Sequence, residues 1–213
     1  MLTHGIFLTI LAFSLGLLLV VFSIPVIIRV AEEKRIFDLN DYRKKHAREV
    51  PAIGGVAIFI GFTLSTILST NGYNIDSLKY IFAAIIILFF TGLKDDILVI
   101  SPNKKFIIQL LAALMLIILG NVRITNLQLV FRLQEISYSG SLFISLLLII
   151  ATVNAYNFID GIDGLASGLG ILSSTVFGTW FLMAGDITYA VMSYAMAGSL
   201  TGFFYFNVFG KKN

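Results

Sequence analysis

The chain carries the stretch Asn154-Ala-Tyr-Asn157-Phe-Ile-Asp160-Gly-Ile-Asp163-Gly-Leu-Ala-Ser-Gly168, which closes an apolar run from Ser141 to Val153. Polar side chains recur in it at every third position, a spacing that keeps successive members close together while the segment is helical. Gly161 and Gly164 then loosen the backbone before a second apolar run begins at Leu165. The stretch therefore predicts a polar site at the junction of two apolar helices.

A polar junction of this kind has two interpretations. Asp and Gly are ordinary turn formers, so the stretch could be a plain turn between two membrane helices. Carboxylates at the membrane end of a helix are costly unless they are paired, hydrated or bound to a cation, and the negative end of the helix dipole disfavours them further. We therefore expect a positive group to complete a site formed by Asn154, Asn157, Asp160 and Asp163.

Composition places the whole chain in a membrane. Of its 213 residues 58% are hydrophobic and only 13% are charged, with a mean hydropathy of +0.94, whereas soluble domains average about 25% charged residues. The first apolar run is longer than the core of a signal peptide, so we expect it to remain as a helix. The absence of Cys excludes disulfides, thiolate catalysis and Cys-ligated metals.

Apolar length predicts an all-α polytopic bundle of about seven transmembrane helices. The segments are roughly 5–30, 52–70, 78–93, 106–120, 141–159, 165–184 and 188–207. Twelve of the 15 Lys and Arg residues fall on one side of this arrangement. The positive-inside rule then places the N-terminus outside and the C-terminus in the cytoplasm.

The same topology gathers acidic residues on the cytoplasmic side. Nine of the twelve Asp and Glu residues lie in the cytoplasmic segments 31–51, 94–105 and 160–164. The outer segments are chemically plain, although alternation in residues 124–133 is compatible with a small hairpin or an interfacial segment. We expect the working side to be the cytoplasmic face.

Two further motifs belong to that face. Asp95-Asp96 ends the third apolar segment, where adjacent carboxylates raise each other's pKa unless a cation offsets their repulsion. The pair could bind Mg²⁺ or could be a solvated helix end. Lys104-Lys105 begins the fourth segment and could anchor lipid or contact a phosphate. Gln109, one turn farther in, is harder to explain as an anchor.

The first cytoplasmic loop is basic. It runs Arg43-Lys-Lys45-His46-Ala-Arg-Glu-Val-Pro51-Ala-Ile-Gly54-Gly55. Its basic cluster is most simply a lipid contact, and His46 could be a proton carrier or a surface side chain. The Gly-Gly pair predicts close approach of a helix or ligand. Together, the three loops indicate metal-assisted phosphoryl transfer or anion transport at the inner leaflet.

The motifs in this order resemble the polyprenyl-phosphate N-acetylhexosamine-1-phosphate transferases, which are all-helical membrane enzymes. The resemblance is carried by Asp38…Arg43-Lys-Lys-His46…Pro51-x-x-Gly54-Gly55, Gly92-x-x-Asp95-Asp96…Lys105-Phe…Gln109 and Asn154-x-x-Asn157-x-x-Asp160-Gly-x-Asp163-Gly-Leu-Ala. The short Arg-Lys-Lys-His-to-Pro spacing is more similar to the N-acetylglucosamine branch than to the muramoyl-pentapeptide branch. Asn40 stands where many relatives have Pro.

The resemblance implies a function. Family members transfer a sugar-1-phosphate, here N-acetylglucosamine-1-phosphate, from a UDP-sugar to undecaprenyl phosphate with Mg²⁺ or Mn²⁺, releasing UMP. This is the first membrane step of an envelope polysaccharide such as lipopolysaccharide or teichoic acid. It further implies a multi-pass protein of the bacterial inner membrane with a cytoplasmic active face. Its partners are then the two substrates, the bilayer and a second copy in a homodimer, and no nucleic acid.

The resemblance also implies roles for individual residues. Asp95 and Asp96 are the implied catalytic carboxylates, with Asp95 as base or lipid-phosphate organiser. The implied substrate contacts are Lys45, His46, Lys105, Asn154, Asn157, Asp160 and Asp163, and the implied metal ligands are Asp96, Asp160 and Asp163.

The resemblance covers residues 1–213 as one membrane domain equivalent to the N-terminal two-thirds of the family fold. Relatives continue beyond Asn207 into a Gly-Asp-x-Gly-Ser segment and a His-bearing loop, so we expect either a fragment or a short paralogue. Two functions stay open: the transferase, and a non-catalytic protein that binds lipid phosphate or nucleotide-sugar. A transporter is disfavoured because the charges are confined to one face.

Overall fold

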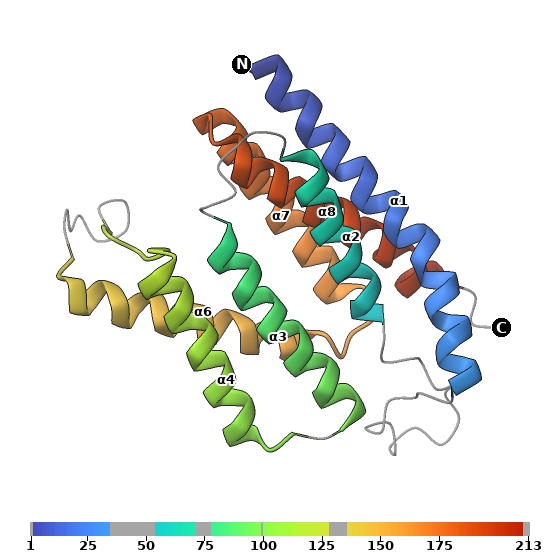
Figure 1. The fold of residues 1–213 in the computed structure, drawn as a ribbon, viewed down its shortest axis with the longest axis horizontal. Coiled ribbons are helices and arrows are strands. Elements are labelled where there is room, and N and C mark those ends of the chain that lie inside the picture. The colour runs from blue at the N-terminus through green and yellow to red at the C-terminus, as the bar shows by residue number, and fades with distance from the viewer. Residues whose placement is uncertain (1, 35–53, 71–77, 99, 128–135, 211–213) are drawn as a thin grey trace. The chain divides into compact units, whose positions relative to one another are not determined.

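The computed structural model describes residues 2–34, 54–70, 78–98, 100–127 and 136–210, and these ranges are almost entirely helical (Figure 1). The elements are α1 (Leu2–Lys34), α2 (Gly54–Ser69), α3 (Lys79–Ile97), α4 (Pro102–Leu114), the π-helical η2 (Met115–Leu119), α6 (Tyr138–Ile159), α7 (Leu165–Ala184) and α8 (Ile187–Phe209). The predicted all-helical fold is confirmed for these ranges, and each of the seven apolar segments coincides with a helix.

Four helical stretches in the described ranges are long and apolar enough to cross a membrane. They are Thr3–Ala31, Pro102–Leu119, Tyr138–Ile159 and Leu165–Ala184. The apolar helix α2 is shorter, with 16 residues. The chain is thus a helical protein of membrane type, while the count of seven spans and the sidedness of the termini stay predictions.

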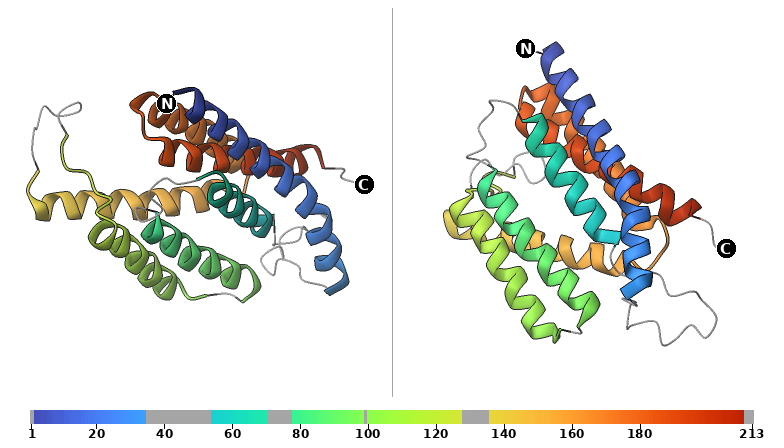
Figure 2. Two further views of the ribbon diagram at one scale, coloured as in Figure 1. Left: turned by 45° about the horizontal axis from the view of Figure 1, so that its top comes forward. Right: turned by 45° about the vertical axis from the view of Figure 1, so that its right-hand side comes forward.

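Contacts between helices divide the chain into two compact units. The terminal unit comprises Met1–Tyr73 and Ile159–Asn213, and the central unit comprises Asn74–Phe158. In the terminal unit α8 packs against α1, α2 and α7, and α1 also packs against α2, as the views of Figure 2 show. In the central unit α3 packs against α4 and η2.

The terminal unit is held together by backbones that come very close. A Cβ at Gly198 of α8 would collide with the carbonyl group of Phe13 of α1, and a Cβ at Gly16 would lie 2.7 Å from the carbonyl oxygen of Ala195. Small residues allow helices in lipid to approach in this way, because van der Waals contact replaces the hydrophobic driving force there. The close packing of α1 against α8 therefore depends on glycines, which have no side chain to keep the backbones apart.

An apolar cluster completes the terminal unit on the side of α2. Val20, Ile24 and Ala57 are buried in it. Gly54 begins α2 against the ring of Phe203 of α8, where a Cβ would lie 2.7 Å from the ring, whereas Gly55 faces open space. The predicted close approach at the Gly-Gly pair is thus confirmed for Gly54 alone.

The π-helical turn η2 is the distinctive element of the central unit. It continues α4 with hydrogen bonds that reach back five residues, as in Gly120 N–H donating to Met115 O at 3.2 Å. Ile117 is buried within it. At its end, Gly120 lies against Tyr80 of α3, whose Cβ would be 3.4 Å from a Cβ built on the glycine. The end of η2 thus lies against the first turn of α3.

The segment between η2 and α6 contains residues 124–133, for which a small hairpin or an interfacial segment was predicted. Residues 128–133 of that region lie outside the described residues. On either side of it, the N–H of Ile136 donates to Thr125 O at 3.2 Å. This backbone pairing brings the two ends of the segment together.

Candidate functional site

A sharp connection between α3 and α4 brings Asp95 and Lys105 together. Helix α3 ends at Ile97 because Leu98 turns to an extended conformation, with φ −135° and ψ 104°. Ser101 is extended too, and Pro102 stands at the start of α4, where its fixed φ and missing N–H suit a first helical residue. The chain reverses within four residues, so a residue ten positions after Asp95 can contact it.

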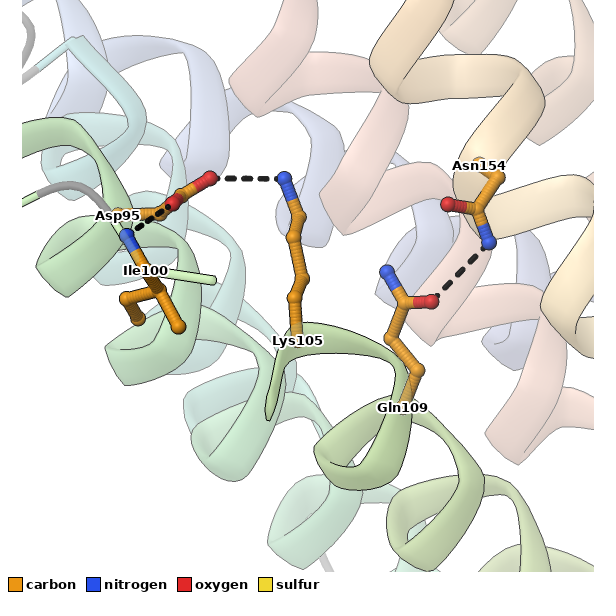
Figure 3. A network of polar contacts seen from close by, with 5 residues as sticks. All are labelled: Asp95, Ile100, Lys105, Gln109 and Asn154. Carbon is orange, nitrogen blue, oxygen red and sulfur yellow. Dashed lines mark hydrogen bonds and ion pairs between the residues drawn. The ribbon is translucent and has the colours of Figure 1, made fainter. Parts of the chain in front are cut away.

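Both carboxylate oxygens of Asp95 are occupied (Figure 3). Oδ2 accepts a hydrogen bond from Lys105 Nζ at 2.8 Å, and Oδ1 accepts one from the backbone N–H of Ile100 at 3.0 Å. The two charged side chains are about one-quarter exposed. The pair therefore forms a fixed ionic contact at the end of α3.

These contacts decide the charge of Asp95. Burial raises the pKa of the Asp95 carboxyl, but the hydrogen bonds from Lys105 and Ile100 and the positive charge of Lys105 together outweigh burial and lower the pKa below its usual value. Asp95 is consequently ionised at neutral pH and is a weak proton acceptor. Its geometry suits holding a cationic side chain better than removing a proton.

Gln109 extends the polar contacts from α4 to α6. It lies four residues after Lys105, so both side chains leave the same face of α4, as Figure 3 shows. Gln109 is buried, and its Oε1 accepts a hydrogen bond from Asn154 Nδ2 at 3.0 Å. Asn154 Nδ2 also donates to Ile150 O at 2.8 Å. We call Asp95, Lys105, Gln109 and Asn154 the polar row.

The polar row brings together residues from three sequence motifs. Asp95, Lys105 and Asn154 were predicted site residues, and Gln109 was singled out as a residue that membrane anchoring did not explain. The structure pairs Lys105 with Asp95, and the predicted role of Lys105 in binding phosphate stays a prediction. The neighbouring Lys104 is exposed.

The other predicted residues of the central unit are accessible. Asp96 and Asn157 are both exposed. Asp96 is the next residue of α3 after Asp95, so its side chain leaves the helix about 100° farther round. The two adjacent carboxylates therefore differ in setting, because Asp95 is partly buried and Asp96 is exposed.

Asp160 and Asp163 lie in a turn of the terminal unit rather than on a continuous helix. Helix α6 ends at Ile159, and α7 begins at Leu165. Both carboxylates are exposed. The spacing of three predicts a single helical row, but the structure limits the helical part to Asn154 and Asn157, because the glycines end the helix as the sequence suggested.

Asn207 of α8 fixes this turn and was not predicted as a site residue. Its Oδ1 accepts a hydrogen bond from the backbone N–H of Gly164 at 2.6 Å. Gly164 has a φ of 76°, which favours glycine, and a Cβ there would meet Val208 and Phe204. The available signal was a lone amide in the aromatic end of α8, residues 203–209.

Two predicted site residues belong to the basic loop. Lys45 and His46 lie outside the described residues. The predicted site residues thus fall into a polar row with neighbouring Asp96 and Asn157 in the central unit, and an acidic turn with Asp160 and Asp163 in the terminal unit.

Comparison with known proteins places the chain in a family. The model of glycosyl transferase family 4 matches residues 78–212, which is more than half of the chain and contains the polar row and the acidic turn. The chain belongs to glycosyl transferase family 4. The resemblance that the motifs predicted is thereby confirmed.

Curated relatives support the assignment to glycosyl transferase family 4. A probable undecaprenyl-phosphate N-acetylglucosaminyl 1-phosphate transferase of Bacillus subtilis (strain 168) is 29% identical over 199 residues, covering 93% of this chain and 55% of the relative. An undecaprenyl-phosphate alpha-N-acetylglucosaminyl 1-phosphate transferase of Escherichia coli (strain K12) is 27% identical over 183 residues, covering 84% and 49%. The chain spans about half the length of the curated relatives it matches.

The donor chemistry of this family 4 chain suits a hard divalent cation. Asp96, Asp160 and Asp163 offer exposed carboxylate oxygens, and the chain has no Cys. The described ranges contain no group of three or more His, Cys, Asp or Glu side chains that could hold a metal. Mg²⁺ does not require such a group, because it retains water and usually binds one or two carboxylates together with substrate phosphates.

Proposed function

We propose that this chain forms part of an enzyme that transfers N-acetylglucosamine-1-phosphate from UDP-N-acetylglucosamine to undecaprenyl phosphate. The polar row is the observation that carries the proposal, because the contact between Gln109 and Asn154 joins two separate family motifs. The names of the relatives support the sugar phosphate and the lipid acceptor.

The proposed reaction is a phosphoryl transfer. An oxygen of undecaprenyl phosphate attacks the sugar-bearing phosphorus of the UDP-sugar, and a new P–O bond forms. The bond from that phosphorus to the oxygen bridging the two phosphates breaks, and UMP leaves with that oxygen and its electron pair. The products are UMP and a lipid diphosphate carrying the sugar.

Within this reaction the polar row would bind and orient phosphate. The acceptor is a phosphate anion, so no proton needs to be removed before attack once the phosphate is ionised. Asp95, held ionised by Lys105 and Ile100, therefore acts as an organiser that aims the Lys105 ammonium, rather than as the base. A cation held in advance stabilises phosphoryl charge without reorganising during the reaction.

A magnesium ion is the proposed cofactor, with Mn²⁺ as the alternative. The family motifs support Asp96, Asp160 and Asp163 as its ligands, because carboxylate oxygens are the donors that Mg²⁺ prefers. When bound, the ion neutralises diphosphate charge and orients the leaving UMP. Lys45 and His46 are proposed further contacts to phosphate, and Asn154 and Asn157 to the nucleotide-sugar.

The proposed setting is the cytoplasmic face of a bacterial inner membrane. A helix bundle with seven spans, an outer N-terminus and a second copy as partner completes the proposal, with the Lys and Arg asymmetry as its support. A polyprenyl phosphate buried in the bilayer would then present its phosphate at the level of the polar row.

The test is product formation in membranes that contain the chain. Membranes are incubated with UDP-N-acetylglucosamine, undecaprenyl phosphate and Mg²⁺, and both lipid-linked sugar and UMP are measured. We expect Asp95→Asn to reduce the rate at least 100-fold, because it releases Lys105 from its ionic contact. The matched control is Asp186→Asn, which changes an exposed Asp at the start of α8 and retains an oxygen for the N–H of Tyr189.

The second candidate function is binding without turnover, because the ionic contact between Lys105 and Asp95 would serve to hold a phosphate group as well as to catalyse its transfer. Radiolabelled UDP-N-acetylglucosamine that binds without forming product would support it. Product formation that survives Asp95→Asn would contradict the proposed transferase site.

A further inference from the structure

Helix α6, which carries Asn154, is held in the central unit by polar atoms. Ser141 and Ser145 are the residues of this 22-residue helix that are buried. None of its large apolar side chains is buried, and several are exposed, among them Phe143 at 64% and Leu147 at 54%. A helix with so little apolar packing depends on hydrogen bonds for its axial position.

The main group of these bonds lies at the end of α6 remote from Asn154. Ser141 Oγ donates to the carbonyl oxygen of Ile124 at 2.5 Å, and Ser145 Oγ accepts from the N–H of Ile124 at 2.8 Å. Both polar backbone groups of Ile124 are thus satisfied by serines one helical turn apart. The two serines bind Ile124 much as a neighbouring strand would.

Arg123 reinforces this contact. Its Nη1 donates to Ser141 Oγ at 3.1 Å, its Nε donates to Asn121 Oδ1 at 3.1 Å, and its guanidinium carbon lies 5.0 Å from the centre of the Tyr138 ring. We call Arg123, Ile124, Ser141 and Ser145 the outer clasp. Arginine suits such a site because its donors form a rigid fork and its plane stacks on aromatic rings.

The outer clasp specifies a single register. A slip of α6 by one residue would move the two serines by about 1.5 Å and turn them by about 100°. Hydrogen bonds tolerate only a few tenths of an ångström around their preferred length, so all three bonds to the serines would break together. The clasp therefore selects one axial and rotational setting of α6.

The same chain segment also contacts α6 at its other end. Gln109 precedes Ile124 on the path through α4 and η2, and it accepts from Asn154, nine residues after Ser145. Nine residues of helix span about 14 Å. Because a helix is stiff over that length, the outer clasp and the Gln109–Asn154 contact must agree in register.

We propose that the outer clasp positions Asn154 for the site by setting the register of α6. Three hydrogen bonds and a cation–π contact at the clasp outweigh the one bond between Gln109 and Asn154. The clasp therefore sets the register of α6, and the Gln109–Asn154 bond forms in that register. Arg123 and the two serines are positioning residues that act from the end of the unit opposite Asn154. The catalytic consequence rests on the proposed function; the register does not.

Engineered cysteines can measure the register directly, because the chain has no Cys. Gln109→Cys and Asn154→Cys are combined in the full chain in membranes, and the rate of joining by a short bifunctional thiol reagent is recorded. This pair lacks the inner hydrogen bond, so of the two polar contacts of α6 with the segment 109–124 the clasp alone remains to hold the register. Adding Ser141→Ala and Ser145→Ala breaks the clasp, and adding Ser139→Ala, an exposed serine outside the clasp, is the matched control.

We expect the clasp double substitution to slow cross-linking at least fivefold and Ser139→Ala to leave the rate unchanged. An unchanged rate in the clasp variant would overturn the proposal. If that variant does not elute as a folded species, Arg123→Gln, which leaves both serine bonds to Ile124, is judged by the same criterion.

A second measurement separates positioning from simple folding. In the chain with native Gln109 and Asn154, the clasp substitutions should raise KM for UDP-N-acetylglucosamine more than KM for undecaprenyl phosphate. Slower cross-linking with unchanged kinetic constants would overturn the role in the site. A native chain without any product would reject the proposed function instead, and cross-linking would still report the register.

Discussion

Each of the two units of the molecule is held together internally by a different kind of contact. In the terminal unit, α1 and α8 touch through their backbones at Gly16 and Gly198, and the contact depends on side chains being absent. In the central unit, α6 is joined to its neighbours by hydrogen bonds from Ser141, Ser145 and Asn154. Close packing tolerates no added atom, while hydrogen bonds specify a direction and a register.

This difference bears on what each kind of contact can do. A glycine contact is insensitive to pH and binds nothing, so it makes a stable frame. A polar contact can bind a ligand or change with it, and the polar row lies in the unit that is built from such contacts. Substitutions at the two kinds of contact should therefore change stability by different amounts.

The largest difference should come from making the same type of substitution, Gly→Ala, once in each unit. Gly198→Ala would drive a Cβ into the backbone of Phe13, which cannot move aside, so we expect a loss of more than about 3 kcal/mol of stability and little folded protein. Gly92→Ala in α3 meets nothing within 4 Å and should stabilise by up to about 1 kcal/mol. Thermal unfolding in detergent compares them, and equal Tm shifts of the same sign would refute the contrast.

A smaller loss is expected at the polar contact within the terminal unit. Asn207→Leu leaves the N–H of Gly164 without its acceptor and should cost about 1–3 kcal/mol. Asn207→Asp keeps the oxygen and should stay close to the native stability. Unfolding measurements on both variants, with UMP release as a second readout, test the pair. Equal losses would show that the oxygen does not hold the acidic turn.

The inner contact of the central unit should show a modest coupling. Asn154→Leu leaves the buried oxygen of Gln109 without its donor, and Gln109→Leu leaves Asn154 with its bond to Ile150 O alone, whereas the double substitution removes both side chains. Hydrogen bonds between membrane helices couple by about 0.6 kcal/mol on average, so the double variant should be more stable than the sum of the singles predicts. Strict additivity in the cycle would mean that the two side chains do not interact.

The smallest effect concerns pH. Because the pKa of Asp95 is lowered in the folded chain, its stabilising contribution is complete above the usual value of about 3.9 and is lost as the pH falls through the lowered folded value. Stability attributable to this pair should thus be flat between pH 7 and 5 and decline below about pH 4. Unfolding of the native chain and of Asp95→Asn at several pH values should converge in acid. A difference that grew on acidification would reverse the assigned sign.

Much of the helical layout could be predicted from sequence. Apolar runs identified the helices of the described ranges, since a backbone in lipid must satisfy its hydrogen bonds internally. Glycines at 161 and 164 correctly indicated the end of α6, and the buried setting of Gln109 agrees with the expectation that it is harder to explain as an anchor. These features depend on local composition and spacing.

The pairings could not be predicted, because each depends on a chain reversal or on helix packing. Lys105 contacts Asp95 only because the chain turns between Ile97 and Pro102. Asn207 reaches Gly164 from 43 residues away, and Asn154 reaches Gln109 from 45. Polar residues in an apolar sequence signal that a partner exists, but the packing decides which one it is.

The number of residues in the π-helical turn η2 determines the orientation of the segment that follows it in the central unit. Its wider loop accommodates one residue more than an α-helical turn would. Removing a residue between Met115 and Leu119 would return the stretch to α-helix and swing everything after it about the axis, drawing Gly120 away from Tyr80. A one-residue deletion there would thus rotate Ile124 and shift its contacts with α6, although both lie well beyond the deleted position.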